Sequence, residues 1–197
     1  MFEQSEFPTH TTLQDRDLLY RLTDYFDSVD SRLRHGEGWL IFNASGRRGS
    51  RIARFVVDRA KELRPARSFL FLPWREVAIT SYLVEVELKS MQDADEALSD
   101  AEREGLQVAT RVSRQTMARS VTTDLLILTD LAPQYDHEIE YLEETIERRY
   151  RDRLSTIILT PEQPHELASD IARNARTGEE AWQRLSQRLY ETSLVAI

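Results

Sequence analysis

The chain has 197 residues, of which 41% are hydrophobic and 30% charged, and its formal net charge is −8. This composition is ordinary for a folded globular protein, and the length suffices for a domain with a sizeable core. The absence of cysteine excludes disulfides, thiolate metal sites and cysteine nucleophiles, and the acidic balance restricts nucleic-acid binding to local basic patches.

The first part of the chain is predicted to contain two buried strands and two helices. Residues 1–12 are an expected extended leader, and apolar residues at helical spacing predict a helix over 13–33. WLIF (39–42) is a short apolar run typical of a buried strand, and an amphipathic helix follows it and stops near Pro65. SFLFLPW (68–74) predicts a second buried strand that ends in proline.

A helical region is expected next. Residues 75–92 are predicted to be helical, although alternating apolar residues in the second half also fit a strand. The acidic stretch 93–105 is a polar helix or a linker, and 106–121 is a helix.

Two further buried strands complete the pattern. DLLILTD (124–130) and STIILT (155–160) are apolar runs, and amphipathic helices are predicted over 136–154, 161–175 and 179–191. Buried strands that alternate with helices predict a parallel sheet covered on both faces. We therefore expect an α/β three-layer sandwich with a mainly parallel sheet, in one domain over residues 1–197.

NASGRRGS (43–50) occupies the place of a phosphate-binding loop between the first strand and its helix. On the Walker A pattern G-x-x-x-x-G-K-[ST], Asn43 and Arg48 take the glycine positions, Gly49 the lysine position and Ser50 the hydroxyl position. The lysine that neutralises the phosphates is therefore absent. The candidate nucleotide-binding residues are Asn43, Ala44, Ser45, Gly46, Arg47, Arg48, Gly49, Ser50 and Arg51.

The loop arginines leave two alternatives open. A guanidinium group binds phosphate well, so Arg47, Arg48 and Arg51 are candidate replacements for the lysine. They are also bulky where glycine lets the backbone approach a phosphate closely. The alternative is a plain connection whose arginines are solvated or contact a partner.

A family resemblance runs nearly end to end. The segments that carry it are FEQSEF, LLYRLTDYFDSVDSRLRHGEGWLIF, DLLILTDLAP and IERRYRDRLSTIILTPEQPHEL. In order and spacing they resemble the core ATPase domain of the DnaC/IstB group of AAA+ proteins, the bacterial helicase loaders and transposition ATPases. The resemblance implies a P-loop NTPase core with degenerate Walker motifs, and with the lid domain absent or reduced.

The resemblance also implies roles for residues that follow the sheet. Thr129 takes the place of the Walker B acid that binds magnesium, and Asp130 the place of the acid that orients the attacking water. Thr160 takes the sensor-1 position. If ATP binds, magnesium would be held by Ser50 and Asp130; the scattered histidines suggest no other metal site.

Two sets of arginines are candidate contacts to partners. The resemblance implies that Arg184 or Arg188 is an arginine finger offered to a neighbouring subunit. It also implies a helical insertion within 93–121, which some loaders use to touch single-stranded DNA. Three arginines of that segment lie near one helical face and could contact DNA or an acidic partner, namely Arg111, Arg114 and Arg119.

The losses in both Walker motifs favour a degenerate AAA+-type pseudo-ATPase that acts as a protein-interaction module in a DNA-associated assembly for replication, transposition or a phage. The alternatives are an ATP- or ADP-binding switch with magnesium, and a DNA-binding adaptor. The expected partners are another protein, such as an active AAA+ ATPase or a helicase, single-stranded DNA, or further copies of the chain. No apolar run is long enough for a membrane span, and a cytoplasmic location is expected.

Overall fold

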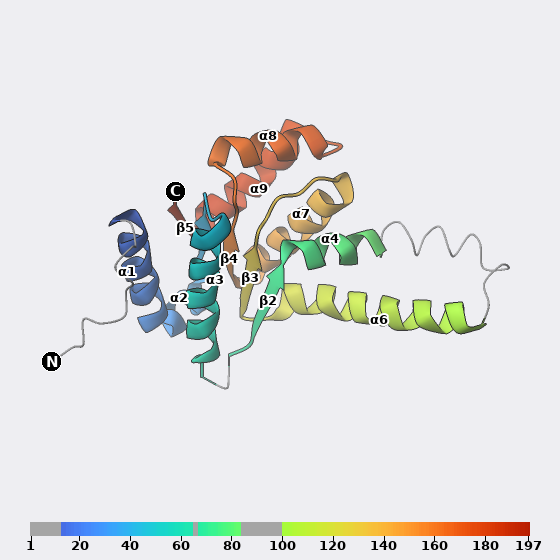
Figure 1. The fold of residues 1–197 in the computed structure, drawn as a ribbon, viewed down its shortest axis with the longest axis horizontal. Coiled ribbons are helices and arrows are strands. Elements are labelled where there is room, and N and C mark those ends of the chain that lie inside the picture. Colours follow the sequence, from blue (N-terminus) through green and yellow to red (C-terminus); the bar gives the residue numbers. More distant parts are fainter. Residues whose placement is uncertain (1–12, 65–66, 84–99) are drawn as a thin grey trace.

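The protein is built on one all-parallel sheet, shown in the computed structural model of Figure 1, which describes residues 13–64, 67–83 and 100–197. The sheet has five strands in the order β2-β3-β4-β1-β5. The strands are β1 (Gly38–Ile41), β2 (Phe69–Pro73), β3 (Leu125–Thr129), β4 (Ser155–Leu159) and β5 (Ser193–Ala196). The predicted α/β fold with a parallel sheet is therefore confirmed.

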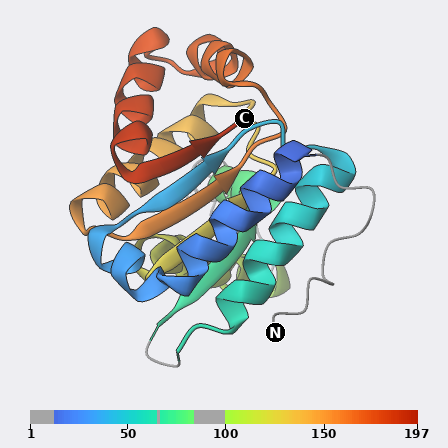
Figure 2. The same cartoon turned by 90° about the vertical axis from the view of Figure 1, so that its left-hand side faces the viewer.

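Helices cover both faces of the sheet and complete three layers. They are α1 (Leu13–Asp27), α2 (Val29–His35), α3 (Gly46–Lys61), α4 (Trp74–Tyr82), α6 (Asp100–Thr122), α7 (Asp136–Arg151), α8 (Pro164–Asn174) and α9 (Glu179–Thr192). Buried residues of α1, α2 and α3 pack on one face, and those of α4, α7, α8 and α9 pack on the other. Figure 2 shows α1 and α3 side by side on the first face.

The two-sided burial explains why the strands were recognisable as continuous apolar runs. Successive side chains of a strand point to opposite faces, so Trp39 and Ile41 join the α1–α3 core while Leu40 and Phe42 join the opposite core. Strands β1, β3 and β4 are buried along their whole length. A strand covered on both faces has no polar face, which is the pattern that the sequence shows.

Two elements differ from the prediction. The helix expected over 13–33 is divided at Ser28, whose hydroxyl donates to the carbonyl oxygen of Asp24 at 2.9 Å and accepts from Arg32 Nε at 3.2 Å. Such side-chain hydrogen bonds compete with the helical ladder. Strand β5 was not predicted, because its short sequence SLVA carries little signal until it pairs with β1.

The region between β2 and β3 is described in part. Helix α4 ends at Tyr82. Residues 84–92 of the helix predicted over 75–92, with its strand alternative, lie outside the described residues, as do residues 93–99 of the expected insertion. The helix predicted over 106–121 is confirmed as part of α6. Among the described helices, none has the length and apolar character to cross a membrane.

Candidate nucleotide site

The loop after β1 is shorter than a Walker loop. Helix α3 begins at Gly46, and the N–H of Gly49 already donates to the carbonyl oxygen of Ser45 at 3.1 Å. The N–H of Asn43 donates to Glu162 and that of Ala44 to Thr160, over 3.0 and 2.8 Å. In a phosphate-binding loop, free backbone N–H groups point at the ligand. Here, the N–H groups of Asn43 and Ala44 hold the loop against the chain that follows β4.

Gly49, at the position of the Walker lysine, has no space for a side chain. A Cβ atom built on Gly49 would lie 2.1 Å from the carbonyl oxygen and 2.8 Å from the carbonyl carbon of Ala44. Both atoms belong to the backbone, so the loop itself would have to move to admit any side chain. The glycine is therefore required by the closed form of the loop.

Arg48 and Arg51 turn away from the loop toward helix α1. Arg48 Nε lies 2.8 Å from Asp15 Oδ1, and Arg51 Nη2 lies 2.7 Å from Asp15 Oδ2. Arg48 Nη1 also donates to the carbonyl oxygen of Phe42 at 2.7 Å. The Asp15 side chain is 7% exposed, so this carboxylate serves as an internal counterion where a phosphate ligand would supply the negative charge.

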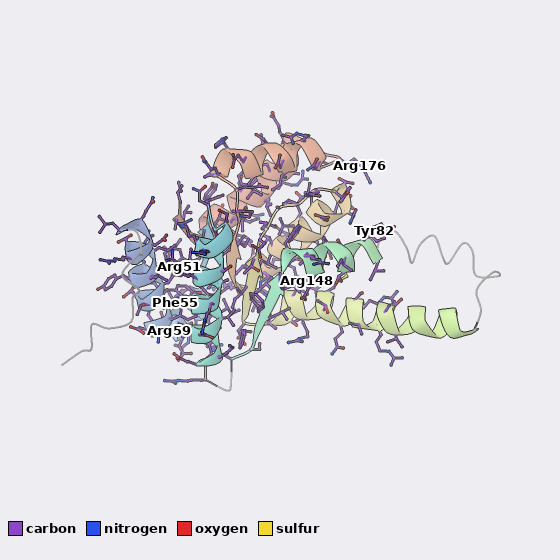
Figure 3. All side chains as sticks on the ribbon, in the orientation of Figure 1. Arg51, Phe55, Arg59, Tyr82, Arg148 and Arg176 are labelled. Atoms are coloured by element: carbon purple, nitrogen blue, oxygen red, sulfur yellow. The ribbon has the colours of Figure 1, made fainter. Side chains whose placement is uncertain are left out.

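A second ion pair joins the same two helices further along. Arg59 Nη2 of α3 lies 2.8 Å from Asp27 Oδ1 at the end of α1, and Figure 3 shows Arg51 and Arg59 spaced along α3. The sequence patterns did not predict a role for Asp15. A signal was present, because Asp15 lies three and four residues before Leu18 and Leu19 on the buried face of the helix. An acid on an apolar face indicates a buried partner.

Ser50 and Asp130, the predicted magnesium ligands, line one small cavity. Its volume is about 160 Å³, and it lies between the start of α3 and the ends of β2, β3 and β4. Ser50 Oγ donates to the carbonyl oxygen of Gly46 at 3.0 Å. Asp130 is exposed and has a positive φ of 56°. Binding sites for ligands of drug size usually have volumes of about 300–1,000 Å³, so this cavity is small for a nucleotide.

Thr160, the predicted sensor-1 residue, is fully buried behind the loop. Its hydroxyl donates to the carbonyl oxygen of Leu131 at 2.8 Å and accepts from the N–H of Glu162 at 3.2 Å. Burial, together with the nearby carboxylates of Asp170 and Glu166, raises the pKa of Glu162 from 4.5 to about 7. In the described part of the chain, Glu162 Oε2 is buried without a hydrogen-bond partner.

The candidate arginine fingers form ion pairs within the chain. Arg184 Nε lies 3.0 Å from Glu143 Oε1, and Arg188 Nε lies 2.9 Å from Glu147 Oε2. The Arg188 guanidinium also lies over the Tyr150 ring, 4.3 Å from its centroid. These contacts fasten α9 to α7, and a role toward a neighbouring subunit stays a prediction.

The arginines predicted to contact DNA lie far along the chain from the loop, on α6. Arg111, Arg114 and Arg119 are all exposed, as are Val108 and Val112 of the same helix, whereas Ser113 and Ser120 are buried. Helix α6 thus turns apolar and basic side chains outward. In the described residues, no group of three or more His, Asp or Glu side chains could hold a metal ion.

Comparisons with known proteins identify the fold. No protein-family model and no curated protein matches the sequence. The crystal structure of the DnaC helicase loader is 18% identical, with a TM-score of 0.61 over 98% of this chain and 95% of that one. A primosome component from Streptococcus pyogenes serotype M3 is 14% identical, with a TM-score of 0.60 over 98% of this chain and 83% of that one.

A third similar structure is that of a DNA replication initiation factor. It is 10% identical, with a TM-score of 0.57 over 95% of this chain and 48% of that one. The chain therefore shares the fold of the DnaC helicase loader structure, which is the fold that the sequence resemblance implied.

Proposed function

We propose that this protein is a AAA+-type pseudo-ATPase that acts as an interaction module in a DNA-associated assembly. The DnaC-type fold supports the association with DNA replication or a related process. The observation that carries the loss of nucleotide chemistry is the contact at Gly49, where a side chain would lie 2.1 Å from a backbone oxygen of Ala44.

The charges around the loop support the same conclusion. ATP binding in P-loop proteins depends on neutralising the β and γ phosphates, to which the Walker lysine contributes. Each lost charge-assisted contact weakens binding by about 1.5–3 kcal/mol. Arg48 and Arg51 do not replace the lysine here, because both already pair with the Asp15 carboxylate on the side of α1.

Hydrolysis is disfavoured for a further reason. Phosphoryl transfer depends almost entirely on the placement of charges around the phosphates. Thr129 stands in the place of the magnesium acid and is buried, and the Ser50 hydroxyl is engaged within α3. The residues present therefore do not fit a nucleotide with magnesium, and we assign no catalytic step to them.

Calorimetric titration with ATP and ADP, with and without magnesium, tests this proposal. We expect no measurable heat at millimolar nucleotide, because the loop offers neither a lysine nor free space at its position. Arg48→Ala should also give no measurable heat of binding. The same is expected of the control Arg54→Ala, which changes an exposed arginine of the same helix. Micromolar binding that Arg48→Ala abolishes and Arg54→Ala preserves would overturn the proposal, since the arginines would then have rebuilt the site.

Exposed apolar side chains support the role as an interaction module. A cavity of about 530 Å³ lies between α4 and the start of α7, lined by Ile79, Tyr82, Tyr135 and His137 among others. The Tyr135 and His137 rings are stacked with 5.6 Å between their centroids, and Figure 3 shows Tyr82 at the end of α4. Contiguous exposed apolar surface marks binding sites for partners. The class of partner that fits the fold is another AAA+ ATPase or a helicase.

A DNA-binding adaptor is the second candidate function. The observation that favours it is the exposure of Arg111, Arg114 and Arg119 on α6, because phosphate contacts require accessible cations. Binding to single-stranded DNA that weakens steeply with salt would favour this function, since counterion release sets the slope.

A further inference from the structure

A further cavity lies at the end of the strands opposite the closed loop. Its volume is about 460 Å³, and we call it the cap cavity because the ends of α2, α7 and α9 surround it. It is lined by His35, Gly36, Arg149, Tyr150, Arg151, Arg153, Leu154 and Thr192. Figure 2 shows these helix ends gathered near the starts of β1 and β4.

Both α2 and α7 end in the same backbone motif at this cavity. After α2, the N–H of Gly36 donates to Leu33 and that of Glu37 to Arg32. After α7, the N–H of Arg153 donates to Tyr150 and that of Leu154 to Arg149, which is the same Schellman pattern. The motif needs a left-handed residue, and the φ angles are 69° at Gly36 and 54° at Arg153.

Arg153 is an unfavourable residue for that position. Glycine, or less often asparagine, takes the left-handed place of a Schellman motif, because a Cβ atom costs about 1–2 kcal/mol there. The chain uses glycine at the first motif and arginine at the second. A non-glycine residue in this conformation is a reason to look for a role of its side chain.

The cations that line the cap cavity are incompletely neutralised. Arg153 is exposed and makes no ion pair within the described ranges of the chain. Among the described residues, the one acid that Arg151 pairs with is Glu147, at 4.0 Å. His35 also lines the cavity, and its Nδ1 donates to the carbonyl oxygen of Ser31 at 2.8 Å.

The neighbouring acids limit the charge of the site without cancelling it. Glu147 has a closer partner in Arg188, at 2.9 Å, and Glu191 accepts from the Tyr150 hydroxyl at 2.7 Å. Asp152 is exposed beside Arg153 in the sequence. The helix C-termini carry partial negative charge, which accounts for basic residues near them but not for an arginine in a left-handed conformation.

We propose that the cap cavity binds the phosphate group of a small phosphorylated ligand through Arg153 and Arg151. Guanidinium groups bind phosphate in a bidentate fork, and a volume of about 460 Å³ suits a small molecule. The site is separate from the loop at Gly49, so the inference does not depend on the proposed loss of nucleotide binding.

Titration of the purified protein with inorganic phosphate and pyrophosphate tests this site, with Arg153→Gly and Arg153→Asn as the variants. Both residues accept a left-handed conformation, so we expect the melting temperature to stay at or above that of the wild type. We expect saturable binding by the wild type and an affinity lowered about tenfold or more in both variants. Arg75→Gln, on the exposed side of α4, is the charge-matched control and should bind as the wild type does.

Three results would overturn the proposal. One is the absence of saturable phosphate or pyrophosphate binding by the wild type. Another is unchanged affinity in Arg153→Gly and Arg153→Asn, which would mean that Arg153 contributes to the end of α7 but not to phosphate binding. The third is binding to a single-stranded oligonucleotide without binding to either small anion, which would make the source of the phosphate a nucleic acid.

Discussion

The backbones of Gly49 and Ala44 touch at the point where a Walker loop would hold its lysine. The glycine removes the lysine charge and also the room for any side chain, because the carbonyl group of Ala44 lies in the space that a side chain would need. The neighbouring Arg48 forms an ion pair within the chain, with the Asp15 carboxylate. At the scale of residues, the candidate nucleotide site is thus filled by contacts of the protein with itself.

Gly49→Ala should destabilise the protein. Its new Cβ atom meets backbone rather than a flexible side chain, so the loop must shift, at a cost of about 1–3 kcal/mol in the free energy of unfolding. Gly105→Ala is the matched control, because Gly105 is an exposed glycine of α6 with nothing within 4 Å of its added Cβ. That change should stabilise the protein by about 0.5–1 kcal/mol. Urea denaturation measures both, and a Gly49→Ala variant as stable as the wild type would contradict the closed loop.

Glu162 should make the stability of the protein depend on pH. Burial and the carboxylates of Asp170 and Glu166 raise its pKa from 4.5 to about 7. The folded state therefore holds this proton more tightly than the unfolded state does. The free energy of unfolding should fall as pH rises from about 4.5 to about 7, and change no further above that range.

Glu162→Gln tests this pH dependence, because glutamine resembles the protonated carboxyl group. We expect the variant to melt at a higher temperature than the wild type at pH 8, and the difference to vanish near pH 4. Glu76→Gln, on the exposed side of α4, is the control. A difference in melting temperature between the wild type and Glu162→Gln that stays constant from pH 4 to pH 8 would rule out the effect.

Elements far apart in the sequence are joined by one buried guanidinium group. Arg149 of α7 is 1% exposed, and its donors reach the end of α6 and the starts of β3 and β4. Its partners are Thr156 Oγ1 and the carbonyl oxygens of Ser120, Thr123, Asp124 and Ser155. Burial lowers the pKa of Arg149 to about 10, so it remains charged at neutral pH. It satisfies backbone acceptors that the strand ladders leave open.

Arg149→Met should lower the free energy of unfolding by roughly 3 kcal/mol or more, because several buried carbonyl groups lose their donor together. Arg148→Met is the matched control, since Arg148 is the exposed neighbour on the same helix. The control should change stability by no more than about 0.5 kcal/mol. Thermal or urea denaturation compares the two, and equal small effects would mean that Arg149 does not join these elements.

At the scale of the whole molecule, cavities lie at both ends of the strands. Parallel α/β proteins bind ligands at the carboxyl ends of their strands. In this protein that end carries the closed loop with its cavity of about 160 Å³, and also the cavity of about 530 Å³ between α4 and the start of α7. The opposite end carries the basic cap cavity of about 460 Å³. With a net charge of −8, anion binding depends on such local groups of cations rather than on the overall field.

The sequence by itself determined the strands β1 to β4 and the helices that alternate with them, and hence the α/β class. Strands buried on both faces appear as continuous apolar runs, and helices with one buried face show a 3.6-residue periodicity. It also located the absent lysine at Gly49. Only the tertiary structure decided where Asp15 points, how Ala44 closes on Gly49 and that β5 completes the sheet. The reason is physical: periodicity reports which face of an element is buried, whereas an ion pair or a backbone contact between distant residues exists only once the elements have packed.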